Sequence, residues 1–283
     1  MSSLADGRVK SERQLERERL RRRHAFRSGT VATASTFVFI VLVVVLVTNS
    51  PGWDRVRETF FSGEAFVDAL PDVVDGFWLN VKIFLIAEPL ILLCGLLIAL
   101  LRELSAPVFF PLRALAVVYV DVFRGVPTLL VILLVGFGLP ALDLQGVPSD
   151  EVTLGVIALT LSYSAYVAEV FRAGIATVHP SQRAAARSLG LSHGQTMRYV
   201  VLPQAVRRVV PPLLNDFVSL QKDTALVSTI GVIEALRQAQ IYAGSTFNYT
   251  PYLVSALLFI LLTIPMARFT DYLAARTARR RGA

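Results

Sequence analysis

Long apolar stretches separated by short polar segments dominate this chain of 283 residues. A transmembrane helix needs about 20 mostly apolar residues to cross the hydrocarbon core of a bilayer. Stretches of that length lie at 31–49, 76–101, 112–139, 152–173, 206–231 and 251–272. The pattern therefore predicts an all-α polytopic membrane protein with about six transmembrane helices.

The composition agrees with this class. The chain has 54% hydrophobic residues, 17% charged residues and a mean hydropathy of +0.58, values that exclude an ordinary soluble domain. Its one cysteine, Cys94, lies inside the second apolar stretch. A single thiol allows neither a disulfide framework nor a cysteine-based metal site, so we expect Cys94 to act as a small buried hydrophobic residue.

The distribution of positive charge predicts the topology. The net charge is +7 and the isoelectric point about 9.9. Arginines gather before the first stretch, around segment 174–205 and near the C-terminal end, whereas the alternate loops carry only Arg55, Arg57 and Arg237. Cytoplasmic loops of membrane proteins are enriched in Lys and Arg. Both termini and segment 174–205 are therefore expected in the cytoplasm, and the basic charge implies no nucleic-acid partner.

The first apolar stretch is expected to stay in the protein. The charged region before it is too long for a signal peptide, and no small-x-small cleavage site precedes Pro51. An uncleaved helix is favoured over a cleaved signal peptide.

Residues 182–203 read Q-R-A-A-A-R-S-L-G-L-S-H-G-Q-T-M-R-Y-V-V-L-P, a polar segment between two apolar stretches. Ser181 is expected to cap a first helix, and Gly190 to end it in the left-handed conformation. Ser192 and Gln195 form a capping-box pattern for a second helix, which Pro203 is expected to end. The segment is thus predicted to be short, rigid and capped at its ends.

The same segment resembles the cytoplasmic coupling loop, the "EAA" loop, of ABC importer permeases. The family spacing is met at Ala184, Ala185, Ala186, Gly190, Val200, Leu202 and Pro203. The family's glutamate is replaced by Ala184. An ordinary connecting loop is the alternative, and the length of the match disfavours it. The resemblance implies an ATPase-coupling role for Ser181, Ala184, Ala185, Ala186, Gly190, Leu191 and Pro203.

Four more segments resemble the polar amino-acid importer permeases. They are Y-V-D-V-F-R-G-V-P-T-L-L (119–130), Y-V-A-E-V-F-R-A-G-I (166–175), L-P-Q-A-V-R-R-V-V-P-P-L-L-N (202–215) and K-D-T-A-L-V-S-T-I-G (222–231). The resemblance implies the transmembrane fold of a type I ABC importer in a bacterial cytoplasmic membrane. It also implies a pair of ATPase subunits that carry ATP and Mg²⁺, a second permease subunit, identical or paralogous, and an extracytoplasmic amino-acid-binding protein. No cofactor is expected in this chain.

This resemblance sets the expected domain organisation. We expect a charged N-terminal tail at 1–28, a first transmembrane span with an extracytoplasmic segment at 29–75, a permease core at 76–273 and a basic tail at 274–283.

Polar residues inside the spans are candidates for a substrate path, because charges in a membrane face the bundle interior or water by default. An amino acid needs a cation for its carboxylate and an acid or hydroxyl for its amine. The candidates are Lys222, Arg124, Asp223, Thr224, Glu88, Asn215 and Glu169. Purely structural pairing is the alternative: Asp121 lies one helical turn from Arg124, Lys222 can pair with an acid on another span, and for Glu169 a structural or gating pair is favoured.

Other classes of function fit less well. The chain has no G-x-x-x-x-G-K-[ST] motif, and its three histidines lie outside the spans, which disfavours an ATPase and an intramembrane enzyme. An ion-gradient-driven secondary transporter is predicted to show repeated halves, and none is visible. Within the family, glutamate or glutamine is the expected substrate, with an opine or a sulfur amino acid as alternatives.

Overall fold

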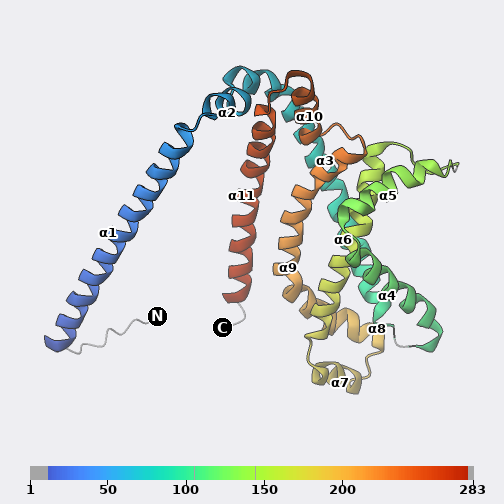
Figure 1. The fold of residues 1–283 in the computed structure, drawn as a ribbon. Coiled ribbons are helices and arrows are strands. Elements are labelled where there is room, and N and C mark those ends of the chain that lie inside the picture. Colours follow the sequence, from blue (N-terminus) through green and yellow to red (C-terminus); the bar gives the residue numbers. More distant parts are fainter. Residues whose placement is uncertain (1–11, 105, 144, 280–283) are drawn as a thin grey trace. The chain divides into compact units, whose positions relative to one another are not determined.

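The computed structural model describes residues 12–104, 106–143 and 145–279, and in these segments every regular element is helical (Figure 1). This confirms the all-α class. The chain divides into two compact units, Met1–Glu58 and Thr59–Ala283, which are considered separately.

The first unit contains α1 (Glu12–Thr48) and the start of α2 (Trp53–Phe60). Residues Ser28–Thr48 are long and apolar enough to cross a membrane, which agrees with the predicted first span. Their large side chains are exposed all round the helix. The hydroxyls of Thr33 and Thr36 donate to the carbonyls of Gly29 and Ala32 at 2.9 and 2.8 Å, so these polar groups are satisfied within the helix.

The second unit is a helical bundle. Its long helices are α3 (Gly63–Arg102), α6 (Glu151–Ala176), α9 (Leu202–Asp223) and α11 (Thr250–Arg279). Its shorter elements are η1 (Pro107–Phe109), α4 (Phe110–Gly125), α5 (Thr128–Ala141), α7 (Pro180–Ser188), α8 (His193–Thr196), η2 (Met197–Val201), η3 (Thr224–Ile230) and α10 (Ala235–Thr246). Among the described residues, four helices are long and apolar enough to cross a membrane, and a bent pair, taken as one span, makes a fifth.

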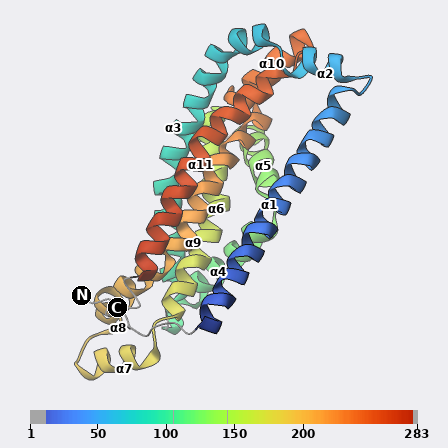
Figure 2. The same cartoon turned by 90° about the vertical axis from the view of Figure 1, so that its left-hand side faces the viewer.

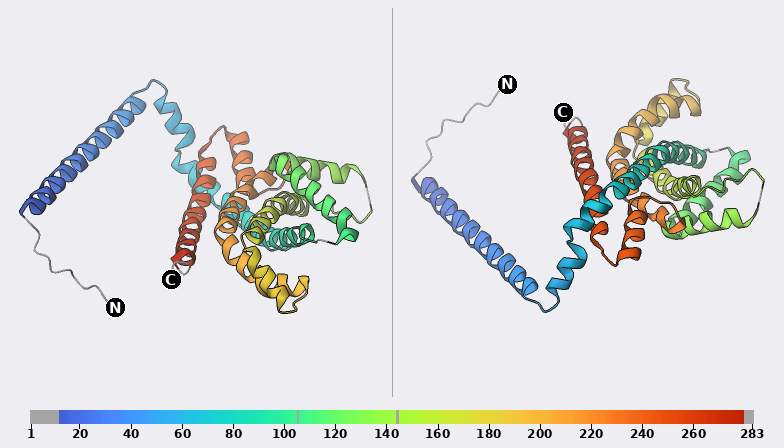
Figure 3. Two further views of the ribbon diagram at one scale, coloured as in Figure 1. Left: turned by 90° about the horizontal axis from the view of Figure 1, so that it is seen from below. Right: turned by 90° about the horizontal axis from the view of Figure 1, so that it is seen from above.

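Helix α6 lies at the centre of this unit. It packs against α3, α4, α5 and α9, and Figures 2 and 3 show these helices around it. Its Leu154, Leu159 and Val167 are almost fully buried and join Ile83 and Ile91 of α3 in the main apolar core. At its start, the carboxylate of Asp150 accepts hydrogen bonds from the Val152 and Thr153 amides, and hydrogen bonding to Thr153 lowers the pKa of Asp150.

The third predicted span, 112–139, is not one continuous helix but a bent pair of helices. The chain bends by 107° between the axes of α4 and α5, at Val126 and Pro127. Pro127 has no amide hydrogen and disfavours helical backbone at the residue before it. Val126 is accordingly extended, with φ −97° and ψ 131°.

The fifth predicted span also changes character along its length. Helix α9 ends at Asp223, and the chain continues as the 3₁₀ helix η3 until Gly231, whose φ is +103°. The prediction of a single α-helix over 206–231 is therefore wrong at its far end. A 3₁₀ segment of this length is uncommon because its hydrogen-bond geometry is poorer than that of an α-helix.

Gly76 allows α3 and the start of α10 to touch. A β-carbon at this position would lie 2.6 Å from the carbonyl carbon of Glu234 and 2.7 Å from the amide nitrogen of Ala235. Both neighbours are backbone atoms, which cannot rotate away. We expect Gly76→Ala to lower the stability of the detergent-solubilised protein by about 1–3 kcal/mol, the usual range for overpacking, measured as a fall in thermal unfolding temperature.

Gly138→Ala is the matched control, because nothing lies within 4 Å of a β-carbon there. An unfolding temperature that is unchanged in Gly76→Ala would show that the two helices are not held in this contact.

Candidate functional site

The N-cap of helix α7 lies two residues earlier in the chain than predicted. Its N-cap is His179, whose Nδ1 accepts from the Ser181 amide at 3.3 Å and lies 2.7 Å from the Ser181 hydroxyl. Pro180 occupies the first turn, where its missing N–H leaves no bond unmade. The expectation that Ser181 is the N-cap is therefore wrong, because His179 supplies the capping acceptor.

The end of α7 agrees with the prediction. Gly190 has a φ of +84°, and its amide donates to the carbonyl of Arg187 at 2.9 Å. The amide of Leu191 donates to the carbonyl of Ala186 at 3.2 Å. These two bonds satisfy carbonyls that the helix end leaves open.

The second helix of the segment starts as predicted and continues further than predicted. Ser192 and Gln195 form the capping box, with distances of 2.9 and 3.3 Å. Helix α8, the π-helix η2 and α9 then follow without a break. The prediction that Pro203 ends this helix is wrong: Pro203 lies in the first turn of α9. Proline cannot donate to a carbonyl four residues earlier, and the wider π turn before it accommodates that lost bond.

The predicted coupling residues lie on two sides of this segment. Ala184, Ala185 and Gly190 are exposed, as is the neighbouring Leu189 with 83% of its surface accessible. Ala186 is buried. Ser181 is exposed and Leu191 is half-buried. The segment therefore presents small and apolar residues outward among polar ones, and it is fastened on its other side.

Arg183 fastens α7 to the bundle. Its guanidinium donates to the carbonyl of Ile175 at 2.8 Å and lies 3.7 Å from the carboxylate of Glu103. In addition, the buried residues Ile175 and Val178 pack with Val201 and Ala205. These contacts join the segment to the ends of α3, α6 and α9.

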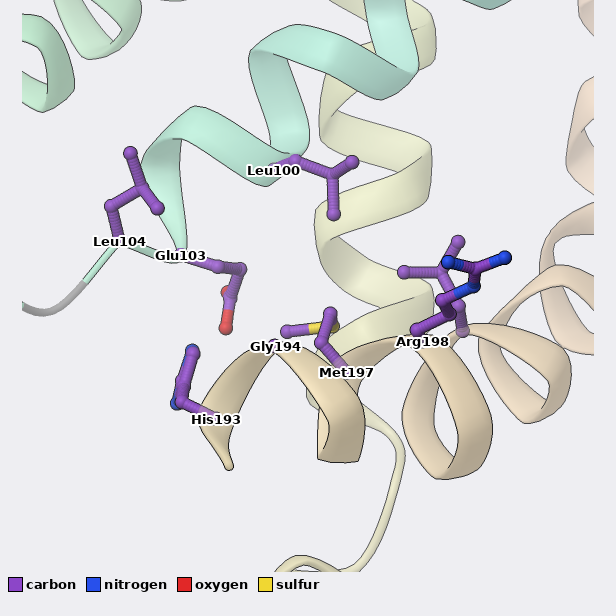
Figure 4. A pocket seen from close by; sticks show the side chains of 8 residues that line it. Leu100, Glu103, Leu104, His193, Gly194, Met197 and Arg198 are labelled. Carbon is purple, nitrogen blue, oxygen red and sulfur yellow. The ribbon is translucent and has the colours of Figure 1, made fainter. Parts of the chain in front are cut away.

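A cavity of about 320 Å³ lies between the end of α3 and α8 (Figure 4). Its lining residues are Leu100, Glu103, Leu104, His193, Gly194, Met197, Arg198 and Leu202. Figure 4 shows the side chains of Glu103 and His193 pointing toward each other across it. The segment that carries α7 is thus not tightly packed against α3 at this place.

Within the bundle, two of the predicted path residues come together at two tyrosines of α6. The hydroxyl of Tyr163 donates to the Asp223 carboxylate at 2.7 Å. The guanidinium of Arg124 lies 6.0 Å from the ring centroid of Tyr166, whose hydroxyl is 3.5 Å from the Arg124 carbonyl. The two rings are 6.2 Å apart. We call these four residues the tyrosine cluster.

The tyrosine cluster lies where α4 and α9 end. Next to it, the hydroxyls of Thr128 and Ser162 are 3.0 Å apart. Arg124 is exposed, and no described ion pair joins it to Asp121. The cluster can therefore offer a cation to a carboxylate and an acid to an ammonium group within one region. Sequence reasoning missed Tyr163 and Tyr166, although their spacing of three residues places them on one face of the helix.

The other predicted path residues have different surroundings. Thr224 is fully buried and accepts a hydrogen bond from Asn80 at 3.2 Å, in a network that also holds the Ala235 amide. Lys222 and Asn215 are exposed on α9, and Glu88 is half-buried on α3. No described hydrogen bond or ion pair joins these three to the tyrosine cluster.

Glu169 is firmly paired. It accepts from Arg102 of α3 at 2.9 Å and from Arg172 of its own helix. It lies near the end of α6 that leads to α7. Its surroundings are those of the structural or gating pair that the sequence favoured.

Comparison with known proteins connects both regions to one family. The family described as "binding-protein-dependent transport system inner membrane component" matches residues 91–279. The chain is 35% identical over 204 residues to the probable glutamine ABC transporter permease protein GlnM of Bacillus subtilis, covering 72% of this chain and 92% of that one. It is 32% identical to the arginine transport system permease protein ArtQ of the same organism, with 71% and 90% covered.

Solved structures give the same connection. The structure described as an amino acid ABC transporter with histidines has 36% identity and a TM-score of 0.68, covering 76% of this chain and 98% of that chain. A methionine ABC transporter, MetNI, has 17% identity, a TM-score of 0.59 and coverage of 72% and 95%, and shows the shared fold. The matched family region includes α7 and the whole tyrosine cluster.

Proposed function

The chain belongs to the family of binding-protein-dependent transport system inner membrane components, and on this basis we propose that it is the permease subunit of an ATP-driven importer of polar amino acids. Relatives named for glutamine and arginine transport support this substrate class. Glutamate or glutamine is the substrate we propose first. An ion-gradient-driven transporter is not favoured.

The observation that carries the proposal is the construction of α7. The helix is capped at both ends and tied to the bundle by Arg183, and its outer side exposes two alanines among polar residues. A rigid element of this kind transmits movement, whereas a loop without caps would absorb it. Two ATPase subunits would dock on residues 181–203 of two permease subunits, and ATP and Mg²⁺ would be held by the ATPases.

The topology follows from this assembly. The end of the bundle that carries α7 would face the cytoplasm, together with both termini, in a bacterial cytoplasmic membrane. An extracytoplasmic binding protein would deliver the amino acid at the opposite end. ATP binding would bring the ATPases and both α7 helices together, shifting a two-state bundle toward its outward-open state through the higher affinity of ATP for the closed ATPases.

In the membrane, we place substrate contact at the tyrosine cluster. Arg124 would bind the α-carboxylate and Asp223 the ammonium group, while the Tyr163 hydroxyl holds one carboxylate oxygen of Asp223. The carbonyl end of α4 adds a partial negative charge beside the tyrosine cluster. Lys222 and Asn215 are secondary candidates, and Thr224 is better explained by its buried hydrogen bonds.

The decisive experiment measures uptake of radiolabelled amino acids by proteoliposomes that contain this chain, its partner permease, the ATPase and the binding protein. We expect accumulation of a polar amino acid only with ATP and Mg²⁺ on the ATPase side. Accumulation driven by an ion gradient without ATP would contradict the proposal.

Gly190 tests the coupling role of α7. A residue with a β-carbon is destabilised by about 1–2 kcal/mol in the left-handed conformation, so Gly190→Ala is expected to reorient the end of α7. We predict that this variant remains in the membrane but transports less substrate per ATP hydrolysed. Gly244→Ala is the control, because Gly244 lies within helix α10, outside residues 181–203, and has nothing within 4 Å of a β-carbon. Unaltered coupling in Gly190→Ala would rule out the role.

Arg124 and Asp223 test the substrate site. Asp223→Asn retains an acceptor for Tyr163 and loses the charge, and Arg124→Gln loses the cation. A hydrogen bond to a charged group contributes about 1.5–3 kcal/mol, so each change is expected to raise the KM for uptake about tenfold or more. Arg237→Gln, at an exposed arginine of α10, should leave KM unchanged. If Asp223→Asn and Arg124→Gln had the same KM as Arg237→Gln, the substrate would not bind at the tyrosine cluster.

A further inference from the structure

Two consecutive residues at the end of α3 make ion pairs in two different directions. Arg102, the last residue of α3, lies 2.9 Å from the carboxylate of Glu169 on α6. Glu103, which caps α3, lies 3.7 Å from the guanidinium of Arg183 on α7. The end of α3 is therefore connected to α6 through a cation and to α7 through an anion.

These pairs are partly shielded from water. The side chains of Arg102 and Glu169 are 15% and 23% exposed, and those of Arg183 and Glu103 are 33% and 25% exposed. In contrast, the pair of Arg268 with Asp271 within α11 is 82% and 71% exposed. Shielded charges are screened little by salt, and removing one partner leaves the other charge poorly solvated. Each pair therefore strongly favours staying intact when its helix moves.

Apolar packing offers α7 little direct connection to α3. Among the described elements, α7 packs chiefly against α8 and η2. Between α8 and the end of α3 lies the cavity beside Glu103, which leaves room for displacement (Figure 4). Arg183 links α7 to two other helices through polar contacts: its guanidinium reaches Glu103 at the end of α3 and the Ile175 carbonyl on α6.

We propose that Arg183, Glu103, Arg102 and Glu169 form a relay that carries a displacement of α7 to α3 and α6 together. The proposal rests on the proposed function, and it makes Arg102 and Glu169 positioning residues for transport. Helices α3 and α6 share the most extensive packing in the bundle, with Gly95 of α3 in close contact with Val167 of α6. Moving their ends as one body preserves that packing and tilts the two helices as a unit.

One nearby interaction separates a relay from local stabilisation. Arg172 also pairs with Glu169, but both residues belong to α6, three positions apart. Arg172 has in addition only a smaller charge interaction with Glu103, so its loss removes a partner of Glu169 while the Arg102–Glu169 and Arg183–Glu103 pairs stay in place. Loss of Arg102 removes the ion pair that joins the ends of α3 and α6. The two arginines share one carboxylate, so they form a matched pair of variants.

The test uses the complete transporter in proteoliposomes and measures substrate transported per ATP hydrolysed. Arg102→Ala and Arg183→Ala are each expected to lower this ratio about fivefold or more, the lower end of typical coupling between sites, while ATP hydrolysis continues. Arg102→Lys keeps the cation and is expected to restore most of the ratio. Because loss of Arg183 already separates α7 from both Glu103 and the Ile175 carbonyl, the double alanine variant is expected to be no worse than Arg183→Ala alone.

Arg172→Ala and Arg268→Ala are the controls, and both are expected to keep a ratio near that of the unmodified complex. An unchanged ratio in Arg102→Ala would overturn the relay, as would equal loss in Arg172→Ala. Parallel loss of transport, hydrolysis and thermal stability would also overturn it, since a merely structural pair behaves in that way. If the unmodified complex showed no ATP-dependent uptake, the proposed function itself would fail.

Discussion

Inside a bilayer, a backbone N–H or C=O group without a partner costs several kcal/mol, because no water is present to replace the missing hydrogen bond. The second unit contains two places where the helical ladder stops inside an apolar stretch, at Val126–Pro127 and over η3. The η3 segment is largely buried by protein, and the first break has Gly125 and Pro127 exposed with polar partners beside it. Around the first, the Tyr166 hydroxyl reaches the Arg124 carbonyl, and Thr128 meets Ser162. Around the second, Asn80 and the carboxylate of Glu234 satisfy the amides of residues 235–237. This constraint explains why the polar residues of the spans gather near helix ends.

The same constraint divides the bundle into a rigid part and a movable part. Helix α6 is buried along most of its length, with small residues that admit close neighbours: Gly155 faces Val227 and Gly174 faces Val209. Close packing of this kind resists internal deformation. At the α7 end, the packing is interrupted by a cavity, and polar contacts take over. Movement of α7 is therefore expected to shift whole helices rather than to deform their packing.

The sequence predicted some features that depend on local chemistry, although it placed the N-cap of α7 at Ser181 instead of His179. Gly190 and the Ser192–Gln195 capping box were correct because each depends on residues within one helical turn. The break at Pro127 was missed because proline alone does not decide it: Pro71 and Pro89 lie inside α3 without ending it. The tyrosine cluster was missed for another reason. Tyr163 and Tyr166 are ordinary members of an apolar helix, and their polar contacts depend on residues about 40 and 60 positions away. Only the folded bundle brings those partners to α6.

The charges of the bundle differ in a way that composition does not reveal. Glu169 is held by two arginines, and its side chain is largely shielded, which is the arrangement of a permanent connection. Arg124 and Lys222 lie deep in the sequence of their spans, yet both are exposed and neither makes a described ion pair. A cation in hydrocarbon without a counter-charge is strongly unfavourable, so these two side chains require water, a second permease subunit or a passing anionic group around them. Paired charges near α7 thus fit a mechanical role, and unpaired charges near the tyrosine cluster fit a role in which the partner arrives from outside the chain.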